Sequence, residues 1–365
     1  TLEALARHGR EGFYSGPVAA ALVSGVRAAG GIWTLEDLRQ YHTVERTPVT
    51  AHYRSWRLVS AAPPSSGGVL LGEMLNMLSG FDLDALDPVA RIHLRVEVMR
   101  RAYRDRAAYL GDPDQVEVPT ARLVHPLYAA GLARDIDPRR ATPSAGCAST
   151  PGGTDTTHFS ILDAEGNRVA ATLSINTPFG SGLVPPGTGV LLNNEMDDFS
   201  TSPGTPNAYG LVGGAANAIA PGKRMLSSMS PSFLESDKGI AILGTPGGSR
   251  IITMVLQAIL SAVAGEGPAE WVAKPRLHHQ FLPDRIEYEP TALTADQVAA
   301  LRAKGHELSL AADGFGNMQA VFWDLAANRV EAASDPRGNG AAEVRLHRDG
   351  KQIVPGASNR RIEVP

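Results

Sequence analysis

Residues 155–175 read DTTHFSILDAEGNRVAATLSI, and this stretch decides the fold of the chain. Strand-like runs at 157–162 and 168–175 flank residues 164–167, AEGN, which are typical of the turn of a β-hairpin. The preceding stretch, 142–155, is rich in Ser, Thr, Gly and Pro, so we expect a flexible and exposed connector. The sequence therefore predicts an antiparallel hairpin whose first strand begins where a linker ends.

Thr156 stands at that junction, directly after Asp155. A loop-to-strand junction needs no special chemistry, and from these residues alone that interpretation stays open. Threonine is a weak nucleophile because its hydroxyl is protonated at neutral pH, so a base must be supplied. Cutting the peptide bond before Thr156 would free its own α-amino group, whose reference pKa of about 7.7–8.0 suits a general base near neutral pH. One residue would then supply both the attacking oxygen and the proton acceptor.

Helices are predicted on both sides of this hairpin. One begins at 15–17, SGP, and ends at 30–31, GG, and a second begins with a capping box of Thr34 and Asp37. The other predicted elements are a loop at 61–68, a long helix from Asp87-Pro88, a buried strand at 240–243, an apolar helix at 251–263, a helix capped by Thr294 and Gln297, and a strand pair at 317–324 and 329–333. Strands grouped in the middle and at the end, with helices on either side, favour α+β layers over alternating βαβ units.

Composition excludes several classes of protein. The 365 residues carry a net charge of −4 without a basic tract, which argues against a nucleic-acid partner. No apolar run reaches the length of a membrane span. The single cysteine, Cys147, excludes an intrachain disulfide and cysteine-rich metal sites, and its Ser/Thr/Gly/Pro surroundings favour a loop position over a catalytic thiol.

A series of motifs in fixed order resembles the γ-glutamyltransferase family of N-terminal nucleophile hydrolases. The motifs cover roughly residues 1–340, and their number and order make a chance resemblance implausible. They are YRSWRLVSAAPPSSGG (53–68), AAYLGDPD (107–114), TTHFSILDAEGNRVAATLSINTPFGSG (156–182), LLNNEMDDFS (191–200), PNAYGLVGG (206–214), RMLSSMSP (224–231), GTPGGSRI (244–251), PRLHHQ (275–280) and ASDPR (333–337).

The resemblance implies a four-layer αββα sandwich with two stacked antiparallel sheets. It also implies a chain that cuts itself before Thr156 and then uses Thr156 to cleave γ-glutamyl amides such as glutathione through a γ-glutamyl ester, which water or an amine acceptor resolves. No cofactor or metal is implied. The expected partners are small donors and acceptors and the two cleavage fragments, which form a heterodimer, without nucleic acid.

By the same resemblance, four residues carry the chemistry. Thr156 is the nucleophile, and Ser174 occupies a position where the family usually has a threonine hydroxyl that hydrogen-bonds it. Gly247 and Gly248 match the oxyanion hole, whose backbone N–H groups stabilise developing negative charge. Each also has a plain explanation: Ser174 as an exposed strand residue, and the glycines as a turn that requires positive φ.

Six further residues are expected to bind substrate, again by resemblance. Carboxylate and amide oxygens accept hydrogen bonds from an ammonium group, and hydroxyl groups donate hydrogen bonds to a carboxylate. Tyr209 matches an aromatic residue on a loop that covers the pocket in many members, although simple loop packing explains it equally well. The set consists of Asn176, Glu195 and Asp198 for the α-amino end of the glutamyl group, Ser227 and Ser228 for its α-carboxylate, and Tyr209.

Three histidines invite a metal or triad interpretation. His278 and His279 are adjacent, which is not the HExxH spacing of a helical zinc site, and a threonine mechanism has its own base. We therefore assign His158, His278 and His279 to structure.

The resemblance also predicts the domain organisation. Residues 1–155 correspond to the C-terminal part of a large subunit and 156–365 to the small catalytic subunit, with 344–365 as an extra tail. The chain begins with Thr1, so we expect that upstream residues, including an arginine that grips the substrate carboxylate, precede it. The compartment is not determined by the sequence, although bacterial members of the family are often exported to the periplasm or the medium.

Two alternatives stay open. A glutaryl acylase of the same family, as in cephalosporin acylases, would act on a side chain that lacks the α-ammonium group. The acidic set makes this alternative weaker. An unprocessed or truncated relative without activity would serve as a structural or binding module.

Overall fold

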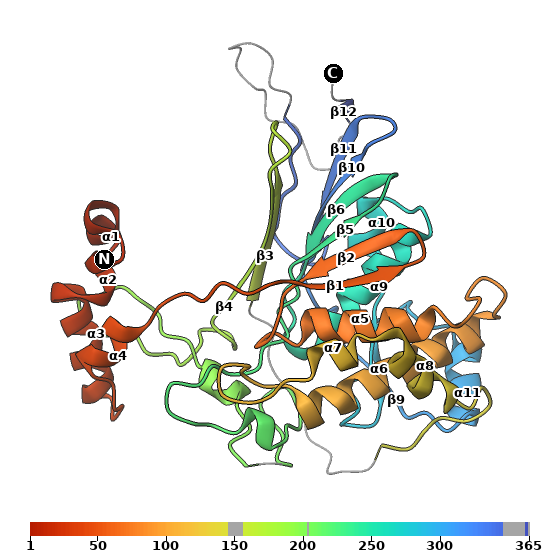
Figure 1. Ribbon diagram of the computed structural model, residues 1–365, viewed down its shortest axis with the longest axis horizontal. Helices are drawn as coiled ribbons and strands as arrows, with labels where there is room; N and C mark the ends of the chain where they lie inside the picture. The colour runs from red at the N-terminus through yellow and green to blue at the C-terminus, as the bar shows by residue number, and fades with distance from the viewer. Residues whose placement is uncertain (145–155, 203, 346–361, 364–365) are drawn as a thin grey trace. The chain divides into compact units, whose positions relative to one another are not determined.

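A computed structural model describes residues 1–144, 156–202, 204–345 and 362–363 (Figure 1). The chain forms two compact units. The smaller consists of residues 1–46 and 175–195, and the larger consists of 47–174 and 196–365. The connector expected at 142–155 lies, from residue 145 onward, outside the described residues, as does Cys147.

The smaller unit is helical, and its core is formed by Ala19, Leu22 and Leu38, against which Val190 and Leu192 pack. The predicted capping box is confirmed, since the Thr34 side chain accepts from the Asp37 N–H at 3.2 Å and Asp37 accepts from the Thr34 N–H at 2.7 Å. The helices of this unit are α1 (Leu2–His8), α2 (Glu11–Tyr14), α3 (Gly16–Ala28) and α4 (Leu35–Gln40).

The larger unit is built on a seven-stranded antiparallel sheet with the order β1-β2-β5-β6-β10-β11-β12. Two of its strands, β1 and β2, precede the hairpin, so the prediction that strands are confined to the middle and end of the chain is wrong. Both strands do alternate buried and more exposed residues over five positions each, so a local signal for the pair was present in the sequence and was overlooked. The strands are β1 (Val49–Tyr53), β2 (Trp56–Ser60), β5 (Ser232–Glu235), β6 (Gly239–Gly244), β10 (Gln319–Asp324), β11 (Arg329–Ser334) and β12 (Ile362–Glu363).

Helices cover one face of this sheet (Figure 1). Helix α9 has the bounds that its apolar run predicts, whereas α5 begins at Gly67, inside the stretch 61–68 that was expected to be a loop. The buried side chains of α5, α6 and α9 form one hydrophobic core with those of the sheet. The helices are α5 (Gly67–Leu78), α6 (Pro88–Tyr109), α7 (Thr120–Leu123), α8 (Pro126–Arg134), α9 (Ile251–Val263), α10 (Pro268–Ala273) and α11 (Ala295–Ala303).

The predicted hairpin is the ribbon of β3 (Thr156–Leu162) and β4 (Arg168–Ser174), which lies over β6 and β10 (Figure 1). Ala241 and Leu243 belong to the helix-side core, so the alternation of side chains directs Ile242 to the opposite face, where the ribbon packs. Two stacked antiparallel sheets with helices on an outer face confirm the expected α+β sandwich.

The ribbon turns its polar side chains inward. Thr156, His158 and Ser160 share the face toward β6 and β10, whereas apolar side chains on the other face of the ribbon are exposed. The exposed side chains are Phe159, Ile161, Val169 and Leu173.

Short elements complete the larger unit. A three-stranded sheet contains β7 (Leu277–His278), β8 (Ile286–Tyr288) and β9 (Leu308–Leu310), with β8 and β9 parallel. The 3-10 turns are η1 (Glu195–Asp198), η2 (Ala215–Asn217) and η3 (Gly248–Arg250). Within the described ranges, every helix is too short or too polar to cross a bilayer.

Candidate active site

The ribbon places the candidate nucleophile opposite its predicted hydroxyl partner. Thr156 begins β3 and pairs in register with Ser174, the last residue of β4, because the tight turn between the strands sets the register. Their side-chain oxygens lie 2.9 Å apart, within hydrogen-bonding distance. This bond restricts the direction of the Thr156 hydroxyl. A nucleophile needs such a fixed orientation toward the carbon that it attacks.

The turn itself explains why the register is this one. Asp163 accepts from the N–H groups of Glu165 and Asn167 at 3.0 and 2.8 Å, and Gly166 takes a φ of 85° that favours glycine. The turn predicted at 164–167 is therefore confirmed.

The two glycines expected to form the oxyanion hole follow the end of β6 and lead into α9. Gly247 has a φ of 142° and Gly248 a φ of 57°, and a turn of 3-10 helix then joins directly to the thirteen-residue α9. A side chain at either position would collide with its surroundings, since a Cβ at Gly248 would lie 2.3 Å from the Tyr209 ring. The positive end of the α9 dipole is directed to the same region.

Tyr209, expected on a covering loop, packs its ring against Gly248 and is 5% exposed. Asn207 holds this loop: its side chain accepts from the Tyr209 N–H at 3.0 Å and donates to Asp198 at 3.1 Å. The loop, the glycine turn and Asp198 are thus brought together, although they are separated in the sequence.

The expected carboxylate-binding serines lie beside a loop from the upstream part of the chain. Ser227 forms a parallel β-bridge with Ser65, and the Ser66 N–H donates to the Ser227 carbonyl at 2.8 Å. Ser228 is 8% exposed and accepts from Arg106 at 3.3 Å.

Arg106, on α6, is a candidate site residue that sequence reasoning missed. Its guanidinium is buried and also donates to the Ser66 hydroxyl at 3.0 Å. Burial lowers the pKa of Arg106, while the nearby negative charge of Asp198 acts in the opposite direction.

A sequence signal for Arg106 did exist. The apolar residues Ile92, Val96, Met99 and Tyr103 recur at helical spacing, and Arg106 takes the next position on that apolar face of the helix.

Asn176 and Glu195 belong to the smaller unit, unlike the other predicted site residues. Asn176 is 2% exposed, has a φ of 74° and donates to the Asn194 carbonyl at 3.1 Å. Glu195 begins η1, and its N–H donates to the Asn193 side chain at 2.9 Å.

The three histidines lie in hydrogen-bonded positions. The His158 ring packs against Gly244 and contacts the hydroxyls of Thr172 at 2.8 Å and Ser160 at 3.1 Å, and burial lowers its pKa to about 4. His278 contacts the Thr253 hydroxyl and the Gln280 amide, both at 2.8 Å, and burial lowers its pKa to about 3. His279 contacts Asp284 at 3.2 Å.

Among the described residues, His93, Glu97 and His306 are close enough to share a metal ion. The Glu97 carboxylate, however, already accepts from Arg100 at 3.2 Å and Arg101 at 2.6 Å. An added cation would meet two guanidinium groups, so this arrangement favours an ionic network over a metal centre.

Comparison with known proteins identifies relatives of this chain. The family model described as gamma-glutamyltranspeptidase matches residues 1–345. The chain is 42% identical over 345 residues to a glutathione hydrolase proenzyme of Escherichia coli and 43% identical over 352 residues to one of Pseudomonas aeruginosa. These matches cover 92% and 94% of this chain but 59% and 63% of the two relatives, so the chain spans about three fifths of their length.

A solved structure shares the fold. The cephalosporin acylase from Bacillus halodurans superposes with a TM-score of 0.80 at 27% identity, and the match covers 94% of this chain and 61% of that one. With the family model matching residues 1–345, this chain belongs to the gamma-glutamyltranspeptidase family.

Proposed function

We propose that this chain is the catalytic part of a self-cleaving γ-glutamyltransferase and glutathione hydrolase. The observation that carries the proposal is the 2.9 Å contact between the Thr156 and Ser174 hydroxyls at the start of β3. The identity to two glutathione hydrolase proenzymes supports the same reaction. In this proposal residues 1–155 and 156–365 become the two fragments of a heterodimer.

Self-cleavage is the first step. The Thr156 oxygen attacks the carbonyl carbon of Asp155 and forms an ester, the C–N bond between the two residues breaks, and the released nitrogen takes up the hydroxyl proton and becomes the α-amino group of Thr156. Water then hydrolyses the ester and leaves a free carboxyl group on Asp155 and a free hydroxyl on Thr156. Ser174 directs the hydroxyl in this step, because it is the hydrogen-bond partner of the attacking oxygen.

Turnover repeats the same chemistry on a γ-glutamyl amide. The α-amino group takes the hydroxyl proton, the oxygen attacks the γ-carbonyl, and the amine leaves with a proton. The N–H groups of Gly247 and Gly248 would stabilise the oxyanion. Water or an acceptor amine then releases the glutamyl group.

Substrate recognition is assigned by charge. Asp198 would hold the α-ammonium group, and Ser227 and Ser228 would hold the α-carboxylate; the binding roles that the resemblance gives Asn176 and Glu195 stay predictions. Tyr209 would cover the bound donor. Arg106 supports this assignment because its buried positive charge lies at Ser228.

Denaturing electrophoresis tests the self-cleavage. By proportion from 38.5 kDa for 365 residues, cleavage before Thr156 gives fragments of about 16 and 22 kDa, and the larger one begins with Thr156. Thr156→Ala is expected to abolish both cleavage and the release of a chromogenic amine from a γ-glutamyl anilide. A folded wild-type protein that stays a single band during long incubation would instead support a non-catalytic relative.

A glutaryl acylase is the second candidate, favoured by the structural similarity to a cephalosporin acylase. A glutaryl donor lacks the ammonium group that Asp198 is proposed to bind. A preference of the cleaved protein for glutaryl over γ-glutamyl anilides would decide in favour of this alternative.

A further inference from the structure

A cavity of about 200 Å³ lies in the larger unit, outside the residues proposed for catalysis and substrate binding. Its wall combines residues of β1, the β1–β2 turn, α6, α9 and the segment after α10. Pockets for larger organic ligands typically measure about 300–1,000 Å³, so this cavity fits a smaller ligand. We call it the basic cavity, after the four cationic side chains in its wall: Arg54, Arg91, Arg95 and Lys274.

The charges of the basic cavity are not balanced. Only two carboxylates line it, and each is paired with one of the cationic side chains. Asp84 is paired with Arg54 at 3.4 Å, and Glu266 is paired with Lys274 at 2.5 Å. Within the part of the chain that the structure describes, no carboxylate is paired with the two arginines of α6. The described residues therefore leave two positive charges without a counter-ion.

The two arginines also keep hydrogen-bond donors that the protein does not use. Arg91 donates to the Leu86 carbonyl at 3.2 Å, and Arg95 donates to the side-chain oxygen of Gln257 at 3.1 Å. The Nε atoms of both arginines are buried and have no hydrogen-bond partner among the described residues. A guanidinium group has five N–H donors in a planar arrangement that matches the oxygens of a carboxylate or phosphate. Both side chains can therefore donate further hydrogen bonds to a ligand.

The two guanidinium groups are held close together in spite of their like charges. Arg91 lies one helical turn before Arg95, and like charges at this spacing destabilise a helix. Gln257 fixes Arg95 from the other side, because its amide N–H donates to the Pro275 carbonyl at 2.8 Å and leaves its oxygen for Arg95. Burial and the Arg91 charge lower the pKa of Arg95 to about 10, so Arg95 is still charged at neutral pH. A bound anion would remove the unfavourable part of this arrangement.

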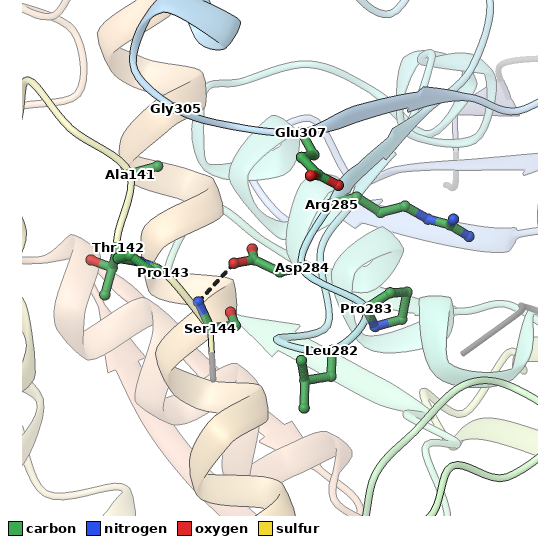
Figure 2. A pocket seen from close by; sticks show the side chains of 10 residues that line it. All are labelled: Ala141, Thr142, Pro143, Ser144, Leu282, Pro283, Asp284, Arg285, Gly305 and Glu307. Atoms are coloured by element: carbon green, nitrogen blue, oxygen red, sulfur yellow. Dashed lines mark hydrogen bonds between the residues drawn. The ribbon is translucent and has the colours of Figure 1, made fainter. Parts of the chain in front are cut away.

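A larger cavity of the same unit, about 390 Å³ in volume, shows how charges are matched elsewhere (Figure 2). Asp284 in its wall accepts from the Ser144 N–H at 2.7 Å and is paired with Arg100. Arg285 in the same wall contacts Glu287 at 3.3 Å. Because the chain itself supplies partners for these two charged residues, the excess positive charge distinguishes the basic cavity.

The basic cavity is remote from the candidate active site. Arg95 and Arg106 both belong to α6 and are eleven residues apart, which corresponds to roughly 16 Å along a helix axis. Ser261 and Val263, which also line the cavity, lie at the end of α9 that is opposite to the glycine turn at Gly248. A ligand in the cavity would therefore not contact the residues proposed to bind the γ-glutamyl donor.

We propose that the basic cavity binds a small oxyanion with two negative charges, such as inorganic phosphate, between the guanidinium groups of Arg91 and Arg95. Two negative charges match the two cationic side chains that have no carboxylate partner. The several oxygens of a tetrahedral oxyanion can accept hydrogen bonds from both arginines at once. This inference does not depend on the proposed enzymatic activity, because binding is measured without turnover.

Equilibrium dialysis with radiolabelled phosphate tests the proposal in the protein at its full natural length. The buffer contains chloride at constant ionic strength, and binding is measured directly because phosphate stabilises proteins against heat even without a specific site. We expect one saturable site per chain. Arg91→Gln and Arg95→Gln should each lower the affinity about tenfold or more, since each removes charged hydrogen bonds, and the double variant should show no saturable binding.

Arg134→Gln is the matched control. It changes the net charge by the same amount, but Arg134 is exposed at the end of α8 and does not line the cavity. Its phosphate affinity should stay within about twofold of wild type, because distant surface charges are screened by salt. Arg95→Lys keeps the charge without the planar pair of donors and is expected to bind phosphate with intermediate affinity.

Arg91→Gln keeps the test decisive even where Arg95→Gln does not fold, because the Arg91 contact that it removes is with a backbone carbonyl. In chloride without phosphate, this variant is expected to unfold at the same temperature as wild type or a higher one, since one of two like charges is gone. A lower unfolding temperature together with wild-type phosphate affinity would overturn the inference and give the arginine a purely structural role.

Two further results would contradict the proposal. One is the absence of saturable binding to the wild-type protein at phosphate concentrations up to about 10 mM, weaker than the millimolar affinity of even a modest site. The other is an equal loss of affinity in Arg134→Gln and the two cavity variants, which would show that net charge and not the cavity attracts the anion.

Discussion

At the scale of single residues, the site depends on contacts that place charge and hydroxyl groups beside one another. Arg106 illustrates this, because its buried guanidinium donates to the Ser228 hydroxyl and lies near the charge of Asp198, the two groups proposed to bind opposite ends of the donor. The Thr156–Ser174 contact has a different origin, since strand register alone places the two hydroxyls together.

Arg106→Met is expected to lower kcat/KM for γ-glutamyl anilides by about tenfold to a hundredfold, because charged hydrogen bonds contribute about 1.5–3 kcal/mol. The loss should lie mainly in KM, since the proposed role is in binding. Arg106→Lys keeps the charge without the two-pronged contact and should recover part of the loss. Arg104→Met is the control on the same helix, because the Arg104 side chain is half exposed and, among the residues that the structure describes, forms its ion pair with its neighbour Asp105. Equal KM values in Arg106→Met and wild type would contradict this role.

At the scale of elements, two junctions position the site: the glycine turn between β6 and α9, and the packing of β3 on β6. At both junctions, the ring of a side chain packs directly against the backbone of a glycine. Tyr209 lies on Gly248 and His158 lies on Gly244, where a Cβ would approach the ring to 2.3 Å.

Gly248→Ala should therefore displace the Tyr209 ring and lower turnover by at least about tenfold, since loss of an oxyanion donor costs about 10²–10³ in kcat. Gly265→Ala is a matched control: Gly265 also has positive φ, at 88°, but a Cβ there meets nothing within 4 Å. Both variants should lose about 1–2 kcal/mol of stability from backbone strain. Kinetics and thermal unfolding of the two variants would separate the effect of the collision with Tyr209 from the effect of backbone strain. Equal turnover numbers in Gly248→Ala and Gly265→Ala would show that the Tyr209 contact is irrelevant to catalysis.

His158 makes the packing of the ribbon on β6 sensitive to pH. Its ordinary pKa of 6.5 is lowered to about 4 in the folded state, so between these values the unfolded chain binds a proton that the folded chain does not. The contribution of His158 to the free energy of unfolding is therefore fully present above pH 6.5. It decreases as the pH drops toward 4, and the total loss is up to about 3 kcal/mol.

His158→Gln keeps polar atoms at this position without the titration. Chemical unfolding at a series of pH values should show a smaller decline between pH 6.5 and 4 for this variant than for wild type. Parallel curves for the two proteins would exclude His158 as a source of the pH dependence.

At the scale of the whole molecule, the proposed cleavage site divides a single fold. Strand β2, which precedes Thr156, pairs with β5, which follows it, from Arg57 opposite Glu235 to Ser60 opposite Ser232. Helices α5 and α6 likewise share one hydrophobic core with α9.

The two fragments should consequently stay together after cleavage. Separating them would expose a continuous apolar core and an open sheet edge, which is strongly unfavourable in water. Gel filtration of the cut protein is expected to give one peak that contains both fragments, and denaturant should be needed to separate them. A fragment that elutes alone from native buffer would show that the shared core does not hold the heterodimer.

The sequence by itself determined the elements whose signals are local. The helix at 251–263, the capping box at Thr34 and the hairpin turn at 164–167 were all predicted within one or two residues, because periodicity, capping and turn chemistry act over a few neighbours. The motifs identified the family and, through it, the candidate nucleophile.

Only the tertiary structure decided which distant segments meet. The pairing of β2 with β5, the contact of Arg106 with Ser228, and the anchoring of Ser144 on Asp284 each join residues more than one hundred positions apart. No local pattern specifies such contacts, because they form only when the shared core brings their elements together. Folding then gives charged groups such as Arg106 and Asp284 partners that their sequence neighbours could not reveal.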